Sequence, residues 1–251
     1  MEEREANATS LELRQAKVDV ASSSGYSNGS MNFPSSDSKP SVYTLFIAGV
    51  DFLNHVLILL LTVFTLYFAL QTVSSYRLHV ALCTLGYILL LSEAIVVFTG
   101  DGVLSSLLTH RGKKHLHWIL QLLGLVCIIV GVWFIYQLET IHFRTTHSIL
   151  GITSLVVMIF VTVFGYPVFI AGKLSKWVRP VTIKFGHNFL GLASFVIGMA
   201  SQCYGYKYRV TDISKEVNFN NVCIVVTCVI TFLSVRRALP TLFQQFLRLF
   251  K

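Results

Sequence analysis

The chain has 251 residues, of which 54% are hydrophobic and 13% are charged, with a formal net charge of +8. An ordinary soluble domain carries roughly 25% charged residues, so the composition indicates lipid as the main solvent. The positive charge does not indicate a nucleic-acid partner. The Lys and Arg residues lie in short breaks between apolar blocks and form no basic stripe of a soluble surface.

Residues 1–41 are polar and serine-rich and lack an apolar core, so we predict a disordered cytosolic N-terminal tail. Six apolar blocks follow, each close to the ~20 residues that a helix needs to cross a bilayer. They are continuously apolar and do not alternate, which excludes a closed barrel. The sequence therefore predicts an all-α membrane protein, a bundle of six transmembrane helices over residues 42–240, with a cytosolic C-terminal tail at 241–251. The expected spans are 42–70, 78–98, 116–136, 147–171, 185–204 and 221–239.

Lys and Arg residues are unevenly divided between the loops on the two sides of this bundle. Eleven of them follow helices 2, 4 and 6, and five follow helices 1, 3 and 5. Because short cytoplasmic loops retain Lys and Arg, we expect both termini to be cytosolic.

Four of the eight histidines lie near the N-terminal ends of successive helices: His79, His117, His147 and His187. Adjacent helices run antiparallel, so His79 and His147 are expected at the non-cytosolic level. His117 and His187 are expected together at the cytosolic level. Two imidazoles from opposing helices are what a six-coordinate b-type haem requires, and filled axial positions leave electron transfer as its task. Two such irons would lie on the order of 20 Å apart across a ~30 Å core.

Glycines follow these histidines on the same helix faces, at spacings of four or seven residues in most cases. A missing side chain there lets a flat macrocycle lie against the backbone. The alternative is close helix packing through small residues, which is common in membrane helices. These glycines are Gly86, Gly124, Gly131, Gly151 and Gly191.

Three further residues carry weaker interpretations. His55 lies four residues after Asp51, so we expect the two to satisfy each other on one helix face. Gln121, one turn after His117, is a candidate contact to a haem or a ligand, or a helix–helix hydrogen bond. Glu93 is expected near the cytosolic end of helix 2, beside a loop lysine.

The cysteines show no metal-ligand or CxxCH spacing, so a haem would be held non-covalently. The remaining histidines, His110, His115 and His142, are expected in loops.

The residues that carry these features resemble the cytochrome b561 family, closest to its small domain-containing members of the D1 and D2 type. The likeness covers about residues 44–237. It rests on His79, Ser92-Glu93-Ala94, His117-Trp118-Ile119-Leu120-Gln121, His147-Ser148-Ile149-Leu150-Gly151 and His187.

The resemblance implies a homodimeric, ascorbate-dependent oxidoreductase with two b-type haems. It would take electrons from cytosolic ascorbate and pass them to monodehydroascorbate or ferric ion on the other side, in an endomembrane (endoplasmic reticulum or vesicle) rather than the plasma membrane. Family members tend to have an ascorbate-contacting basic residue where this chain has His115. Positive charge near the cytosolic haem suits an ascorbate anion or haem propionates, although the positive-inside signal alone also explains it. The candidate residues are Arg111, Lys113, Lys114, His115 and Lys184.

Two other classes remain open from the residues alone. One is a haem-free helical transporter that uses intramembrane histidines as a proton relay, and the other is a structural membrane scaffold.

Overall fold

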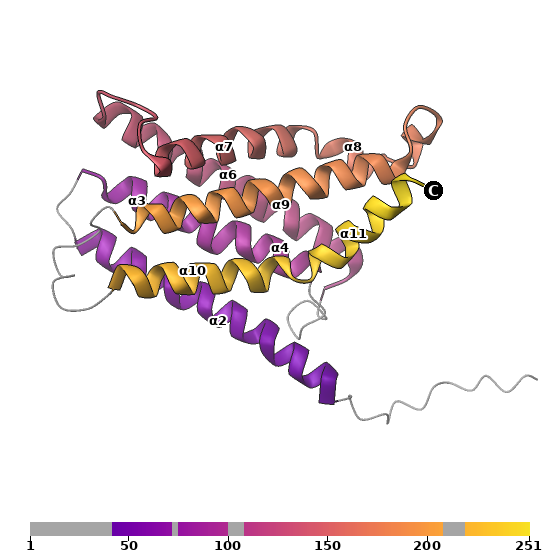
Figure 1. Ribbon diagram of the computed structural model, residues 1–251, viewed down its shortest axis with the longest axis horizontal. Coiled ribbons are helices and arrows are strands. Elements are labelled where there is room, and N and C mark those ends of the chain that lie inside the picture. Colours follow the sequence, from indigo (N-terminus) through magenta and orange to yellow (C-terminus); the bar gives the residue numbers. More distant parts are fainter. Residues whose placement is uncertain (1–41, 72–74, 100–107, 208–218) are drawn as a thin grey trace, which may run out of the picture. The chain divides into compact units, whose positions relative to one another are not determined.

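The computed structural model describes residues 42–71, 75–99, 108–207 and 219–251, which belong to one compact unit, Ser41–Lys251 (Figure 1). The predicted N-terminal tail lies outside the described residues. Throughout the described ranges the regular structure is helical, as predicted. Five helices are long and apolar enough to cross a membrane, or six when the last two, bent by 47°, count as one span.

The first span is α2 (Val42–Gln71), and the second consists of α3 (Arg77–Cys83), a π-helical segment η1 (Thr84–Leu91) and α4 (Ser92–Thr99). The third is α6 (His110–Leu138) and the fourth α7 (Thr146–Val163). The short turns α8 (Tyr166–Phe169) and η2 (Lys173–Lys176) lead to the fifth span, α9 (Pro180–Gly205). The chain ends with α10 (Phe219–Val235) and α11 (Ala238–Leu249).

Local capping explains where three of the helices differ from the predicted spans. Thr109 accepts a hydrogen bond from the Gly112 backbone, so α6 begins six residues earlier than expected. Pro180 occupies the first turn of α9, where its missing N–H costs nothing. The fourth span ends at Val163, well before the predicted residue 171, and Pro167 lies in the first turn of the separate short helix α8.

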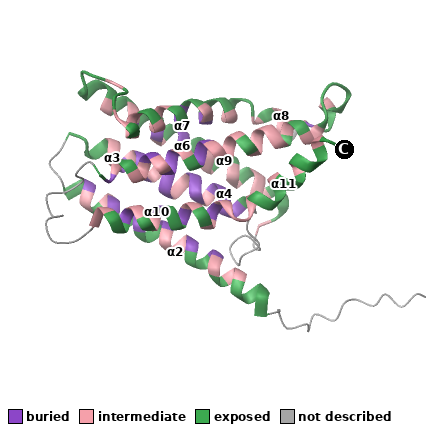
Figure 2. Ribbon diagram, in the orientation of Figure 1, coloured by how far each residue is buried: buried purple, intermediate pink, exposed green. Residues whose placement is uncertain are grey.

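The second span lies at the centre of the bundle. In its apolar window 67% of the residues are buried, against 17–33% in the other four single spans. Figure 2 shows the buried (purple) stretches inside the helix layers and exposed (green) ones along α2 and α11. The exposed side chains of the outer helices include many large apolar residues, as expected of surfaces that contact lipid.

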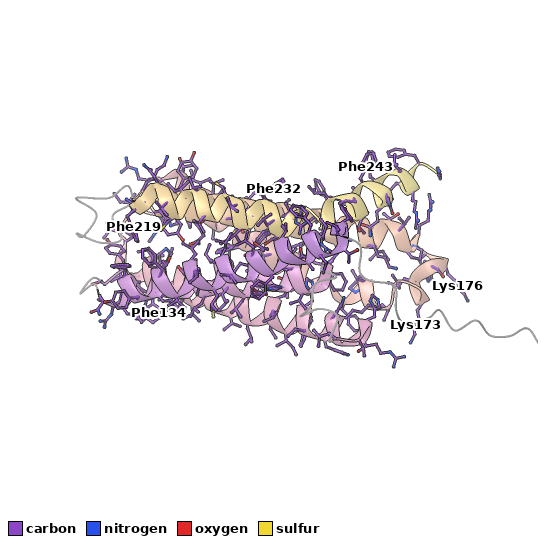
Figure 3. The ribbon with its side chains drawn as sticks, turned by 90° about the horizontal axis from the view of Figure 1, so that it is seen from below. Phe134, Lys173, Lys176, Phe219, Phe232 and Phe243 are labelled. Carbon is purple, nitrogen blue, oxygen red and sulfur yellow. The ribbon has the colours of Figure 1, made fainter. Side chains whose placement is uncertain are left out.

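The stretch 241–251, predicted as a tail, is helical as far as Leu249. The guanidinium of Arg179, just before α9, donates to the carbonyl oxygens of Arg248 and Leu249. Asn188 on α9 donates to Gln245. Figure 3 shows Lys173 and Lys176 at one end of the bundle and Phe134 and Phe219 at the other. The α9–α11 contact therefore brings the C-terminal helix to the lysine-bearing end.

Candidate functional site

His79 and His147 face each other across the end of the bundle where α3 and α7 begin. Their ring centres lie 5.9 Å apart and their planes cross at 82°. Two imidazoles on opposite sides of one metal atom would have ring centres about 6 Å apart, from two metal–nitrogen bonds of about 2 Å and roughly 1 Å from each nitrogen to its ring centre. The spacing of this pair therefore matches one metal atom between the rings.

Backbone carbonyls orient both of these imidazoles. Nδ1 of His79 donates to the carbonyl oxygen of Gly131 over 3.0 Å, and Nδ1 of His147 donates to that of Ser201 over 2.9 Å. A carbonyl oxygen can only accept, so Nδ1 carries the proton in each ring and Nε2 keeps its lone pair. This hydrogen bonding is typical of histidines that ligate a metal.

Gly205 allows His147 to take this position. A methyl group at Gly205 would stand 3.1 Å from Cε1 and 3.3 Å from Nδ1 of the His147 ring. Neither Ser201 nor Gly205 was among the predicted site residues. Ser201 orients the imidazole through its backbone carbonyl, which has no sequence signature. Gly205 comes from a different helix than the histidine it admits.

His117 and His187 lie at the opposite end, each seven residues after the start of its helix. Nδ1 of His117 donates to the carbonyl oxygen of Ala94 over 2.9 Å. His187 is close enough to His117 to interact with it electrostatically. Its Nδ1 is buried and has no hydrogen-bond partner among the described residues. The second predicted pair is thus also brought together.

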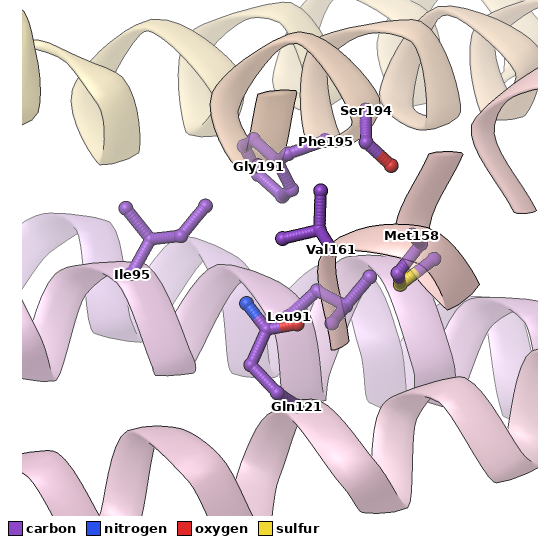
Figure 4. Close-up of a pocket in the computed structure, with 8 residues that line it drawn as sticks. All are labelled: Leu91, Ile95, Gln121, Met158, Val161, Gly191, Ser194 and Phe195. Atoms are coloured by element: carbon purple, nitrogen blue, oxygen red, sulfur yellow. The ribbon is translucent and has the colours of Figure 1, made fainter. Parts of the chain in front are cut away.

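Two cavities flank this second pair. A small one of about 20 Å³, large enough for a water molecule, is lined by Gln121 and Gly191, which lie one turn after His117 and His187. Figure 4 shows the Gln121 amide projecting from α6 toward Val161 and Gly191. A larger hollow of about 260 Å³ between α7 and α9 is lined in part by His187 itself. The surroundings of this pair therefore leave space that side chains do not fill.

The other predicted glycines lie at helix contacts. A methyl group at Gly86 would meet the Ile128 side chain at 2.4 Å, and one at Gly124 would meet Leu91 at 3.1 Å. Gly131 faces Cys83 in the same interface between the second span and α6. Gly151 faces the Ser201 hydroxyl. Close packing accounts for these four positions, and Gly191 is the predicted glycine that lines a cavity.

The basic candidates gather where α6 and α9 begin. Arg111, Lys113, Lys114 and His115 stand on the first turns of α6, and Lys184 precedes His187 by three residues on α9. The prediction that His110 and His115 lie in a loop is therefore wrong, because the Thr109 cap extends α6 over both. His142 precedes α7 as expected, and its ring stacks on Tyr136 with centres 4.0 Å apart.

Asp51 and His55 have different partners from those predicted. Asp51 forms ion pairs with Arg236 and Arg237, the latter at 2.7 Å. His55 instead binds Glu93, which was expected beside a loop lysine; the distances from Nδ1 to the two carboxylate oxygens are 2.7 and 2.9 Å. Spacing along one helix does not reveal which group a neighbouring helix presents.

Tyr76 and Glu139 connect the second and third spans at the His79 end. The Tyr76 hydroxyl donates to the Glu139 carboxylate over 2.9 Å. This hydrogen bond raises the pKa of Tyr76.

Within the described residues, no cluster of three or more His, Cys, Asp or Glu could hold a bare metal ion. What the described residues offer in its place is imidazoles in pairs.

Comparison with known proteins gives consistent matches. The family model described as eukaryotic cytochrome b561 matches residues 78–212. The chain is 26% identical over 175 residues to the human (Homo sapiens) transmembrane reductase CYB561D2, covering 68% of this chain and 78% of the relative. It is 28% identical over 150 residues to the mouse (Mus musculus) lysosomal membrane ascorbate-dependent ferrireductase CYB561A3, covering 58% and 60%.

A rice protein (Oryza sativa subsp. japonica), the probable ascorbate-specific transmembrane electron transporter 1, is 28% identical over 145 residues, covering 56% of this chain and 60% of the relative. No solved structure matches the chain.

Proposed function

Because the chain belongs to the cytochrome b561 family, whose members carry b-type haem, we propose that it transfers electrons across a membrane between two such haems. Each haem would be held non-covalently by two imidazoles, one by His79 and His147 and the other by His117 and His187. The protein would act as a transmembrane oxidoreductase, in agreement with the names of its relatives.

The observation that carries this proposal is the geometry of His79 and His147. Their ring centres are 5.9 Å apart, and both Nδ1 protons are engaged by backbone carbonyls. With both Nδ1 protons engaged in this way, Nε2 is the atom of each ring that could ligate a metal atom placed between them.

The residues at the second pair have a related role. When bound, a haem supplies an iron centre that accepts and releases single electrons. His117 is oriented by the carbonyl of Ala94, and mostly apolar side chains line the hollow beside His187. Lys113, Lys114 and Lys184 stand within about a turn of the two histidines on helices that begin at the same end. Their charges suit haem propionates or an anionic reductant.

We propose ascorbate as the electron donor at this end, since two relatives are named as ascorbate-specific or ascorbate-dependent. The acceptor at the His79 end would be monodehydroascorbate or ferric ion. The excess of Lys and Arg at the donor end supports a cytosolic orientation of that end and of both termini. Homodimer formation and an endomembrane location stay predictions from the family resemblance.

The test is an absorption spectrum of the purified protein before and after addition of ascorbate. We expect sharp b-type bands on reduction, with a haem content of about two per chain, as two bis-imidazole sites require. A visible spectrum without bands would remove the proposal and favour a haem-free role for the intramembrane histidines. Bands that dithionite produces and ascorbate does not would keep the haems and exclude ascorbate as donor.

A further inference from the structure

We propose that His55 and Glu93 form a proton-accepting pair, which takes up one proton when an electron enters the site between His117 and His187. The inference rests on the proposed function and adds a proton-linked group to it. No histidine of the two predicted haem pairs belongs to this group.

The geometry of the pair is that of a bifurcated imidazole–carboxylate contact. Nδ1 of His55 lies 2.7 Å from one carboxylate oxygen of Glu93 and 2.9 Å from the other. Both side chains are largely buried, with 21% and 18% of their surfaces exposed. They come from different spans, α2 and α4. Ionisable groups at such positions are costly in a membrane and mark proton or ion pathways more often than packing.

The pair is linked to the second histidine site through one peptide unit. Glu93 immediately precedes Ala94, whose carbonyl oxygen accepts the Nδ1 proton of His117 over 2.9 Å. A charge on the pair and a charge at the His117 site therefore lie close together in a region of low dielectric, where electrostatic coupling is strong. Adding an electron at the site favours adding a proton to the pair.

The chemistry of the donor requires a proton acceptor. An ascorbate monoanion that gives up one electron also loses one proton and becomes the monodehydroascorbate radical anion. The electron enters the site between His117 and His187, and one proton is taken from the donor side at Nε2 of His55. Nδ1–H of His55 meanwhile continues to donate to Glu93, whose carboxylate balances the imidazolium charge. When the electron moves on to the His79 end, Nε2 returns its proton to water.

The surrounding charges distinguish this pair from Asp51, a buried carboxylate among the described residues. Asp51 lies one turn before His55 on α2, but it is neutralised by Arg236 and Arg237 beyond α10. From α6, which packs against α4, the groups to consider are His117, Lys113 and Lys114. Tyr87 on η1 turns its hydroxyl to Ser154. Among the described carboxylates, Glu93 is thus the one paired with an imidazole, a group that ordinarily titrates near neutral pH.

The test is a spectroelectrochemical titration of the purified holoprotein over the pH range in which histidine titrates. The variant His147→Ala would keep the haem of the His117 site alone. The reduction potential that it retains is therefore assigned to that site. We expect the equilibrium constant for reduction of the His117 site to rise by up to tenfold for each pH unit that the pH falls. For one electron, this is a rise of about 59 mV in the reduction potential. The potential of the His79 site should be independent of pH.

Glu93→Gln keeps a side chain of the same size and removes the carboxylate, so it should flatten this slope while haem content is retained. His55→Gln should also flatten the slope, and it replaces Glu93→Gln in the test if that variant does not fold. Glu139→Gln, which changes a carboxylate at the opposite end, is the matched control and should leave the slope intact. An infrared reduced-minus-oxidised spectrum of the wild-type protein should also show imidazole bands. These bands should be absent from the spectrum of His55→Gln.

Two results overturn the inference and leave the proposed function standing. One is a protein with two haems whose potentials do not vary with pH. The other is a slope that survives both Glu93→Gln and His55→Gln. A protein without haem bands refutes the proposed function itself, and this inference with it.

Discussion

His147 and Ser201 form a reciprocal pair of hydrogen bonds between α7 and α9. The imidazole Nδ1 donates to the Ser201 carbonyl oxygen over 2.9 Å, and the Ser201 hydroxyl donates to the His147 carbonyl oxygen over the same distance. Ser201 is almost fully buried, at 1% exposed. The ring that we propose as a haem ligand is thus held at both its side chain and its backbone.

We expect Ser201→Ala to weaken haem retention at the His79–His147 site by about tenfold, the lower end of the effect of losing an outer-shell partner. The carbonyl that accepts from Nδ1 remains, but the hydroxyl that ties it to the helix of His147 is lost. Haem release during dilution, followed by absorbance, measures this. The haem of the other pair is the internal control, and equal loss from both sites would contradict the assignment.

Single histidine variants test the pairing. His117→Ala or His187→Ala should remove one haem and leave the other, and His79→Ala or His147→Ala should remove the complementary one, because each haem needs two axial imidazoles. About half of the haem absorbance and one of two redox components should remain in every case. Loss of the same component from all four variants would show that the pairs are wrong.

Gly198→Ala should destabilise the protein by roughly 1–3 kcal/mol, the usual cost of overpacking a core. Its methyl group would stand 2.1 Å from Cε1 of the Tyr87 ring, which is buried and donates a hydrogen bond to Ser154. Thermal unfolding in detergent measures the effect.

Gly49→Ala is the matched control for this substitution, since nothing lies within 4 Å of the added methyl group. It should be neutral or slightly stabilising, by up to about 1 kcal/mol. An equal destabilisation by both substitutions would indicate a general intolerance of the helices and no special contact at Gly198.

Asp51→Asn should destabilise the fold by about 3 kcal/mol or more, because it removes a buried carboxylate charge that pairs with both Arg236 and Arg237. The Asp51 side chain is 6% exposed and each arginine 18%. The same unfolding measurement on Glu139→Gln should show a much smaller change, since its contact to Tyr76 is exposed. If Asp51→Asn leaves thermal unfolding unchanged, the ion pairs do not anchor α2 to the end of α10.

The sequence by itself determined the class of the protein. Length and continuity of the apolar blocks predict membrane helices because a helix must satisfy its own backbone in lipid. The antiparallel order of successive helices then assigns His79 with His147 and His117 with His187. Both pairings follow from helix direction alone, and the structure brings the members of each pair together.

Only the tertiary structure decided which groups support those histidines and which form separate contacts. The acceptors for His79, His117 and His147 are backbone carbonyls, which every residue possesses, so no residue type reveals them. The π-helical segment η1 also changes the face of the residues that follow it. An α-helix turns about 100° per residue, so one extra residue per π turn rotates Glu93 away from the face of His79. Glu93 meets His55 on α2, a contact that depends on how two helices pack and is absent from the spacing within either one.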